Sequence, residues 1–189
     1  MKKRIFCLVL AILIFSACGT MGVLADYSVP QTLVEYSETE PISVPENVIE
    51  IDLTKEKPMS ANDLQWNMAR GTSVPTQKWD FVNNGGYYGN FSGVAAGIYT
   101  NYYFTGVSVL RVRFDNLTTT GSTQLVYMIK DLSNNTVYGP YTSEIISGSS
   151  NLELFRQFTV SSSGKYCVFF RTNNYEQISG RITVNTSMW

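Results

Sequence analysis

The chain has 189 residues, a formal net charge of −1 at neutral pH and no histidine, and 44% of its residues are hydrophobic. Such a chain is long enough to bury a sizeable core, and it has no basic block of the kind that binds nucleic acid. Without histidine it cannot contain a Ser-His-Asp or Cys-His nucleophilic system or a histidine-ligated zinc site.

Residues 1–25 have the pattern of a bacterial secretion signal. Three basic residues at positions 2–4 precede an apolar run at 5–15, whose length suits the hydrophobic region of a signal peptide. Small residues follow and lead to Val-Leu-Ala, so we expect cleavage after Ala25. The mature protein is therefore expected to be extracytoplasmic, either secreted or held at the cell surface.

Two other outcomes remain open for this segment. The stretch Phe-Ser-Ala-Cys-Gly around Cys18 is similar to a lipoprotein box, in which the cysteine would be lipidated. Alternatively, residues 5–25 approach the roughly 20 apolar residues that span a bilayer, although two glycines and a threonine dilute their second half. Membrane contact is expected only through such a lipid or N-terminal anchor.

Residues 26–46 carry three prolines and an excess of acids with little hydrophobic periodicity, which predicts an extended, solvated linker. Residues 47–189 then form the predicted folded domain. Cys167 is the one cysteine outside the signal, so we expect no internal disulfide. Its apolar neighbours favour a buried, inert thiol.

The first elements of the domain are a strand and a short helix. Residues 48–53 alternate between apolar and acidic side chains, as a half-buried strand does. Residues 60–70 could form one or two helical turns from a Ser60 cap. After them, strands at 78–82 and 87–91 are expected to be joined through Asn84-Gly85, the dipeptide of a type I′ hairpin.

The next strand, 107–114, alternates regularly. Leu110, Val112 and Phe114 are expected to face the core, and Arg111 and Arg113 to face solvent. The Thr-, Gly- and Asn-rich run that follows, residues 115–122, is expected to turn the chain.

The remaining strands are expected at 99–104, 124–130, 136–138, 152–160, 165–172 and 178–184, with a turn at 133–135. Residues 166–170 are apolar on both faces, which predicts a central strand. About eight or nine short strands separated by Gly, Asn and Ser turns predict an all-β fold. We expect a two-sheet antiparallel β-sandwich of the jelly-roll or immunoglobulin-like kind.

Two stretches resemble parts of known proteins. Residues 158–169 resemble a hairpin of extracellular bacterial β-sandwich modules, in which a Gly turn followed by Tyr joins neighbouring strands. Residues 99–106, together with the signal and the acidic linker, resemble small secreted β-sandwich proteins of Gram-positive gut bacteria. The resemblance implies a β-sandwich fold and an extracytoplasmic location, and it implies no function.

An aromatic group between two glycine-rich turns is the main candidate for ligand binding. Exposed Tyr and Trp could stack on sugar rings or pack on a protein partner. The alternative is that these side chains fill the core and the sheet edges. The candidate residues are Trp79, Tyr87, Tyr88, Tyr99, Tyr102 and Tyr103.

Calcium is the one cofactor that the sequence makes plausible. Asp115 and Asp131 lie beside asparagines and offer the oxygen ligands that Ca²⁺ prefers, but turn formation is the favoured explanation of these residues, so no cofactor is expected. Hydrolysis by a carboxylate pair needs two acids placed together, and no such pair is visible in sequence. The acids available are Asp80, Asp115, Asp131, Glu144, Glu153 and Glu176.

The sequence therefore favours a non-catalytic extracellular binding or interaction module, with a glycan or a protein as partner. Carbohydrate binding through the aromatic residues is the sharper version of this hypothesis. A small carboxylate-dependent glycoside hydrolase and a self-assembling structural surface protein remain alternatives, and the oligomeric state stays open.

Overall fold

The computed structural model describes residues 32–35, 48–60, 73–150 and 152–187. The expected signal with Cys18 and Ala25, most of the expected linker, and residues 61–70 of the expected helix lie outside these ranges. Within them, no helix is long and apolar enough to cross a membrane.

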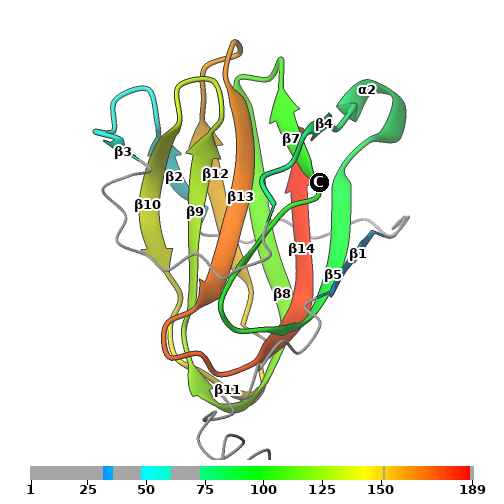
Figure 1. Cartoon of the computed structure of the whole chain (residues 1–189), viewed down its shortest axis with the longest axis vertical. Coiled ribbons are helices and arrows are strands. Elements are labelled where there is room, and N and C mark those ends of the chain that lie inside the picture. Colours follow the sequence, from blue (N-terminus) through cyan, green and yellow to red (C-terminus); the bar gives the residue numbers. More distant parts are fainter. Residues whose placement is uncertain (1–31, 36–47, 61–72, 151, 188–189) are drawn as a thin grey trace, which may run out of the picture.

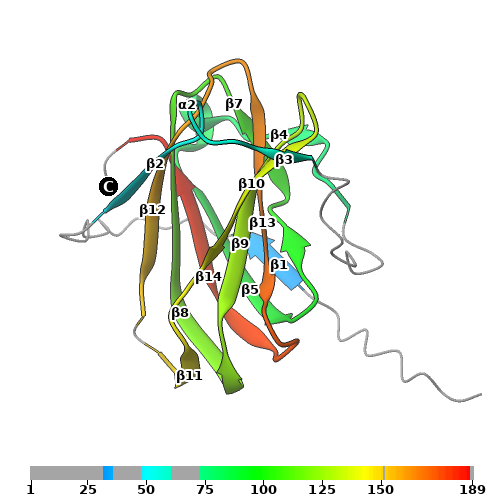
Figure 2. The same ribbon diagram turned by 90° about the vertical axis from the view of Figure 1, so that its left-hand side faces the viewer.

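Two sheets pack face to face (Figures 1 and 2). Sheet A has the order β1 (Thr32–Glu35), β5 (Tyr87–Val94), β14 (Ile178–Asn185), β8 (Val109–Thr123), β12 (Leu154–Thr159), β2 (Ile49–Asp52), and β11 (Ile146–Ser149) also pairs with β8. Sheet B has the order β3 (Met59–Ser60), β10 (Thr136–Thr142), β9 (Leu125–Asp131), β13 (Lys165–Thr172), β7 (Tyr102–Thr105), β4 (Gln77–Lys78), and β6 (Ile98–Tyr99) also pairs with β13.

This architecture confirms the predicted all-β sandwich, but the sheets are mixed rather than purely antiparallel. β2 runs parallel to β12, and β4 runs parallel to β7. Both are edge strands whose partners lie far along the chain, so no hairpin dictates their direction.

The core lies between the sheets. Leu110, Val112 and Phe114 of β8 are at most 1% exposed, as their alternation predicts. The Phe114 ring meets the rings of Tyr127 and Phe170 from the opposite sheet, at centroid distances of 5.3 and 5.2 Å. Such aromatic contacts join the sheets and hold their spacing.

The outer face of sheet B carries a second apolar cluster, which explains why residues 166–170 are apolar on both sides. The cluster contains Tyr99, Met128, Val137, Cys167 and Phe169. Cys167 is fully buried, and burial raises the pKa of its thiol to about 12. The expected buried thiol is therefore present, and its high pKa disfavours the reactive thiolate.

The expected hairpin at Asn84-Gly85 is wrong, because a helical turn, α2 (Phe81–Asn84), occupies this stretch. Oδ1 of Asp80 caps the turn by accepting the N–H groups of Val82 and Asn83 at 2.9 and 3.2 Å. Gly85 ends it with φ +67° and donates its N–H to the carbonyl oxygen of Phe81. The side-chain cap thus outweighs the hairpin preference of the dipeptide.

The expected turn at 115–122 is also wrong, because β8 continues to Thr123 and pairs with β14 and β11. Asn116 has φ +50°, and the pairing with β14 shifts by one residue at this point. The turn-forming residue therefore produces a β-bulge within a long strand.

Other differences concern the ends of the sheets. Thr32–Glu35, inside the expected linker, forms edge strand β1, and Leu33 packs against the core. Ser60, expected as a helix cap, lies in β3 and pairs with Thr136. The two strands within 158–169 belong to different sheets, so their connection crosses the end of the sandwich and is not a hairpin between neighbours.

Candidate functional site

The six aromatic candidates lie in three different surroundings. Trp79, Tyr87 and Tyr102 form one cluster, with ring centroids 5.1 to 6.2 Å apart. Tyr87 is fully buried, and Trp79 and Tyr102 pack partly buried against the core. The Trp79 Nε1–H group donates to the carbonyl oxygen of Gly85 at 3.0 Å, so this indole also holds α2 in place.

Tyr99 and Tyr103 lie on the outer face of sheet B. Tyr99 is 6% exposed, and the ammonium group of Lys130 lies 5.8 Å from its ring centroid. The ammonium group of Lys165 lies 5.7 Å from the ring centroid of the half-buried Tyr103. Tyr88 follows the inward-facing Tyr87 on its strand and so faces outward from sheet A. The fold does not gather the six rings onto one surface.

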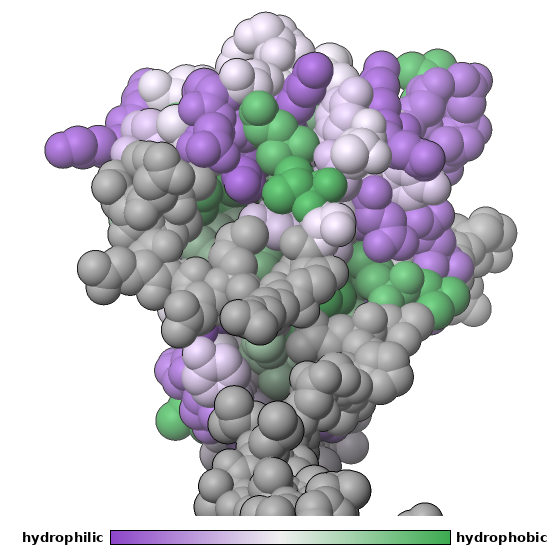
Figure 3. All heavy atoms as spheres, viewed as in Figure 1, coloured by the Kyte–Doolittle hydropathy of each residue, from purple (hydrophilic) through white to green (hydrophobic). Residues whose placement is uncertain are grey.

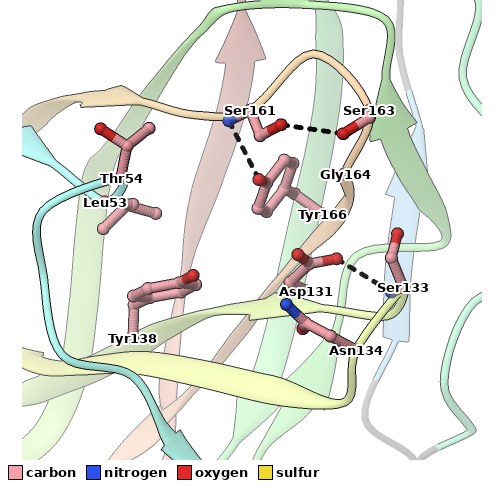
Figure 4. A pocket seen from close by; sticks show the side chains of 10 residues that line it. All are labelled: Leu53, Thr54, Asp131, Ser133, Asn134, Tyr138, Ser161, Ser163, Gly164 and Tyr166. Atoms are coloured by element: carbon pink, nitrogen blue, oxygen red, sulfur yellow. Dashed lines mark hydrogen bonds between the residues drawn. The ribbon is translucent and has the colours of Figure 1, made fainter.

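A different group of residues surrounds a cavity of about 250 Å³ at one end of the sandwich. We call it the end pocket (Figure 4). It is formed by the β2–β3 connection, the β9–β10 turn with the start of β10, and the β12–β13 connection. Its lining residues are Leu53, Thr54, Asp131, Ser133, Asn134, Tyr138, Ser161, Ser163, Gly164 and Tyr166.

The end pocket lies at the end of the sandwich, where the space between the two sheets opens to solvent. Asp131 and Tyr166 lie opposite each other in the pairing of β9 with β13, and Tyr138 faces inward from β10. Figure 2 shows the chain between β2 and β3 crossing from one sheet to the other at this end. In the space-filling view, polar residues gather at the same, upper end of the molecule (Figure 3).

The β12–β13 connection is fixed around the Tyr166 ring. The Tyr166 hydroxyl accepts the N–H of Ser161 at 3.1 Å, and Gly164 donates its N–H to the Ser161 carbonyl oxygen at 3.0 Å. A Cβ atom on Gly164 would lie 2.4 Å from atoms of this ring, so the close approach requires glycine. Burial, with a contribution from Asp131, raises the pKa of Tyr166, so its neutral hydroxyl keeps a proton to donate.

Asp131 is the charged residue of the end pocket. Its side chain is buried, and Oδ1 accepts the N–H groups of Ser133 and Lys165 at 2.9 and 3.3 Å. Among the described residues, no group donates a hydrogen bond to Oδ2. The carboxylate is thus fixed through one oxygen, and its other oxygen is available as an acceptor.

Asn134 complements this acceptor with donors. Its Oδ1 accepts both the N–H and the hydroxyl of Thr136, at 3.2 and 2.6 Å, so its amide N–H groups are left to donate. The Thr54 hydroxyl donates to Oδ1 of Asp52 at 2.6 Å and so adds an acceptor only. The Ser161 and Ser163 hydroxyls lie 2.9 Å apart and share one hydrogen bond, so one of the two keeps a proton to donate. With the ring of Tyr138 these groups can hold a small polyhydroxylated ligand.

Sequence reasoning missed the end pocket. Its walls come from three segments that are widely separated in sequence, and residues 161–164 have only the pattern of a turn. The local sequence makes Asp131 a candidate calcium ligand only, because the signal that would mark it as a pocket residue lies in the strand pairing.

The second calcium candidate, Asp115, lies on the outer face of sheet A between two arginines. Its Oδ1 accepts from Nε of Arg181 at 2.5 Å, and its Oδ2 lies 3.0 Å from Nε of Arg113. The Arg113 contact is an ion pair by distance without hydrogen-bond alignment. Two guanidinium groups here oppose cation binding. In the described ranges, no three Asp, Glu or Cys side chains are grouped to hold a metal ion.

Arg113 also pairs through Nη2 with Glu153. Arg113 points outward from sheet A, as the alternation predicts, but its side chain is only 11% exposed because its ion pairs with Asp115 and Glu153 cover it. Asp115 and Glu153 thus lie near each other, but Arg113 bridges them. Of the other acids considered for hydrolysis, Asp80 caps α2 and Asp131 lines the end pocket.

No protein-family model and no curated protein matches the sequence. Among solved structures, the CBM22-1 xylan-binding domain of Paenibacillus barcinonensis Xyn10C aligns with 52% of this chain and 71% of that domain, at 10% identity and a TM-score of 0.38. A family 6 carbohydrate-binding module aligns with 75% of this chain and 99% of that module, at 13% identity and a TM-score of 0.33.

An isomalto-dextranase of Arthrobacter globiformis T6, complexed with panose, aligns with 53% of this chain at 14% identity and a TM-score of 0.35. The alignment spans 21% of that enzyme. The chain is, by its own structure, a two-sheet β-sandwich with a polar pocket at one end.

Proposed function

We propose that this chain is an extracytoplasmic, non-catalytic binding module that holds a carbohydrate in the end pocket. The observation that carries the proposal is the lining of this pocket. It combines an aromatic ring, several hydroxyl groups, one amide and a fixed carboxylate oxygen that no described group satisfies.

These groups match the chemistry of a sugar. A sugar ring has apolar C–H faces that pack on aromatic rings, and hydroxyl groups that both donate and accept hydrogen bonds. Tyr138 offers the ring, Asp131 the strong acceptor and Asn134 the donors. Buried polar groups that a ligand satisfies contribute specificity as well as affinity, because a ligand lacking the partner leaves them unpaired.

The size of the cavity limits the ligand. At about 250 Å³ it is smaller than the roughly 300–1,000 Å³ of sites for drug-sized molecules. We therefore expect it to take about one sugar ring, either a free monosaccharide or the terminal residue of a longer chain. We therefore expect the ligand in the end pocket, and not at the six aromatic residues that the sequence suggests.

The carboxylates at the pocket support the non-catalytic part of the proposal. Glycoside hydrolysis uses two carboxyl groups on either side of the scissile bond. Asp131 is the one carboxylate among the residues that line the pocket, and the chain has no histidine to act as a general base. The proposed address rests on the signal pattern of residues 1–25 and on the acidic segment behind it.

The test compares two tyrosine variants by glycan array and by calorimetry on the hits. Tyr138→Ala removes the ring of the end pocket and should weaken glycan binding by roughly tenfold or more. Tyr103→Ala, which removes a half-buried ring from the outer face of sheet B, is the matched control and should bind as the unchanged protein does. Absence of any glycan hit, or loss of binding in the Tyr103 variant alone, would refute the proposal.

A further inference from the structure

We infer that the end pocket selects its ligand by charge, taking neutral or amine-bearing sugar residues and rejecting acidic ones through the carboxylate of Asp131. This inference rests on the proposed function and goes further, because it names the class of sugar. Uronic acids and sulfated sugars are the rejected class.

The Asp131 carboxylate is held in place by the backbone. The two N–H groups that donate to Oδ1 belong to Ser133, in the β9–β10 turn, and to Lys165, at the start of β13. The carbonyl oxygen of Lys165 in turn accepts the N–H of Leu132 at 2.7 Å, which ties the two segments together. The fold therefore sets the direction of Oδ2 before any ligand arrives, and little order has to be created on binding.

No described cation offsets this negative charge within the pocket. The ten lining residues include neither lysine nor arginine. The two lysines closest to Asp131 in the strand pairing, Lys130 and Lys165, direct their ammonium groups to the outer face of sheet B, over the rings of Tyr99 and Tyr103. Lys55, near the β2 side of the pocket, is paired with Asp52 at 2.8 Å.

Neutral, 2-amino and acidic sugars differ in the hydrogen bonds and charge interactions that they can make with Oδ2 of Asp131. A neutral sugar donates a hydroxyl proton to it in a charge-assisted hydrogen bond. The ammonium group of a 2-amino sugar donates as well and adds attraction between opposite charges. A carboxylate or sulfate group has no proton to donate and is repelled at close range, where burial keeps screening weak.

The variant Asp131→Asn tests the negative charge of Asp131 separately from its hydrogen bonds to the backbone. The asparagine oxygen can still accept the N–H groups of Ser133 and Lys165, so the turn is retained. The position of Oδ2 becomes an NH₂ donor without charge. Glu144→Gln, at an exposed position, is the matched control for the loss of one negative charge.

Calorimetry should compare three ligands that share a core: a neutral oligosaccharide, its terminal uronic acid form and its terminal 2-amino form. The unchanged protein and Glu144→Gln should bind the acidic form at least tenfold more weakly than the neutral form, and the amino form at least as tightly as the neutral one. Asp131→Asn should reduce the preference for the amino form by about tenfold and narrow the discrimination against the acidic form.

Equal binding of the acidic and neutral forms by the unchanged protein would overturn the inference and leave the proposed function standing. Discrimination that persists in Asp131→Asn would also overturn it. If the unchanged protein binds none of the three ligands and no other glycan, the proposed function itself fails, and the charge selection fails with it.

Discussion

Asp115 and Asp131 are buried to nearly the same extent, 6% and 5% exposed, yet their carboxylates have very different partners. Asp115 lies between the guanidinium groups of Arg113 and Arg181 on the outer face of sheet A. Asp131 makes no ion pair with a described lysine or arginine, and backbone N–H groups hold one of its oxygens.

The difference separates a structural carboxylate from one that is available to a ligand. Both oxygens of Asp115 face arginines, and Glu153 extends the network by pairing with Arg113. Its charge is therefore compensated within the fold. The charge of Asp131 is stabilised by aligned backbone dipoles that leave Oδ2 facing the end pocket. Burial alone does not distinguish the two roles, whereas the identity of the hydrogen-bond donors does.

The largest loss of folding stability is expected when the Asp115 carboxylate, which compensates the charges of two arginines, is removed. Asp115→Ala leaves the half-buried Arg113 and Arg181 without the carboxylate that they share, and Arg113 keeps only its ion pair with Glu153. Breaking a buried ion pair from one side costs about 3 to 5 kcal/mol of folding free energy. Urea unfolding should detect this loss as a lower midpoint with an unchanged slope.

The exposed Glu144→Ala is the control for Asp115→Ala, and it should stay within about 0.5 kcal/mol of the unchanged protein. A cost below about 1 kcal/mol for Asp115→Ala would mean that the network on sheet A contributes little, and the contrast with Asp131 would lose its basis.

A smaller effect is expected at the wall of the end pocket. In Gly164→Ala the new Cβ would lie 2.4 Å from the Tyr166 ring, so the ring or the turn must move. Overpacking of this kind costs roughly 1 to 3 kcal/mol. The displaced ring would also deform the pocket, so the variant should lose glycan binding as well as stability, by calorimetry and urea unfolding respectively.

Gly106→Ala is not a clean control for Gly164→Ala, because Gly106 has a positive φ of +73°. Asp115→Ala is the better comparison, since it should lose stability and keep its glycan affinity while it remains folded. If Gly164→Ala kept full affinity, the Tyr166 wall would not shape the binding site.

Local hydrophobic patterns in the sequence predict much of the fold. The alternation of Leu110, Val112 and Phe114 identifies the core face of β8, and the apolar run around Cys167 identifies a central strand. The strand predicted over residues 165–172 is β13, which has the same bounds. These features depend on hydrophobic periodicity, which the sequence carries directly.

The errors occur where a single side chain or a distant strand decides the conformation. Asp80 caps a helical turn that the Asn84-Gly85 pair does not predict, and the pairing of β8 with β14 and β11 draws a turn-like sequence into a strand. The sequence does not predict the end pocket for the same reason. Its walls meet only after the sheets have formed. The N–H of Ser133, two residues after Asp131, is a donor that a local Asx turn provides, but the N–H of Lys165 reaches the carboxylate only through the pairing of β9 with β13.

The smallest effect on stability is expected at Asp131, provided that the acceptor is kept. Asp131→Asn retains an oxygen for the N–H groups of Ser133 and Lys165, so its cost should stay below about 1 kcal/mol. Asp131→Ala removes the acceptor and leaves both N–H groups without their partner, which should cost about 1 to 3 kcal/mol. Both variants lose the charge, so any selection against acidic sugars should weaken equally in the two. A large loss of stability in Asp131→Asn would show that the fold needs this negative charge, as it does at Asp115, and the two aspartates would then no longer represent different roles.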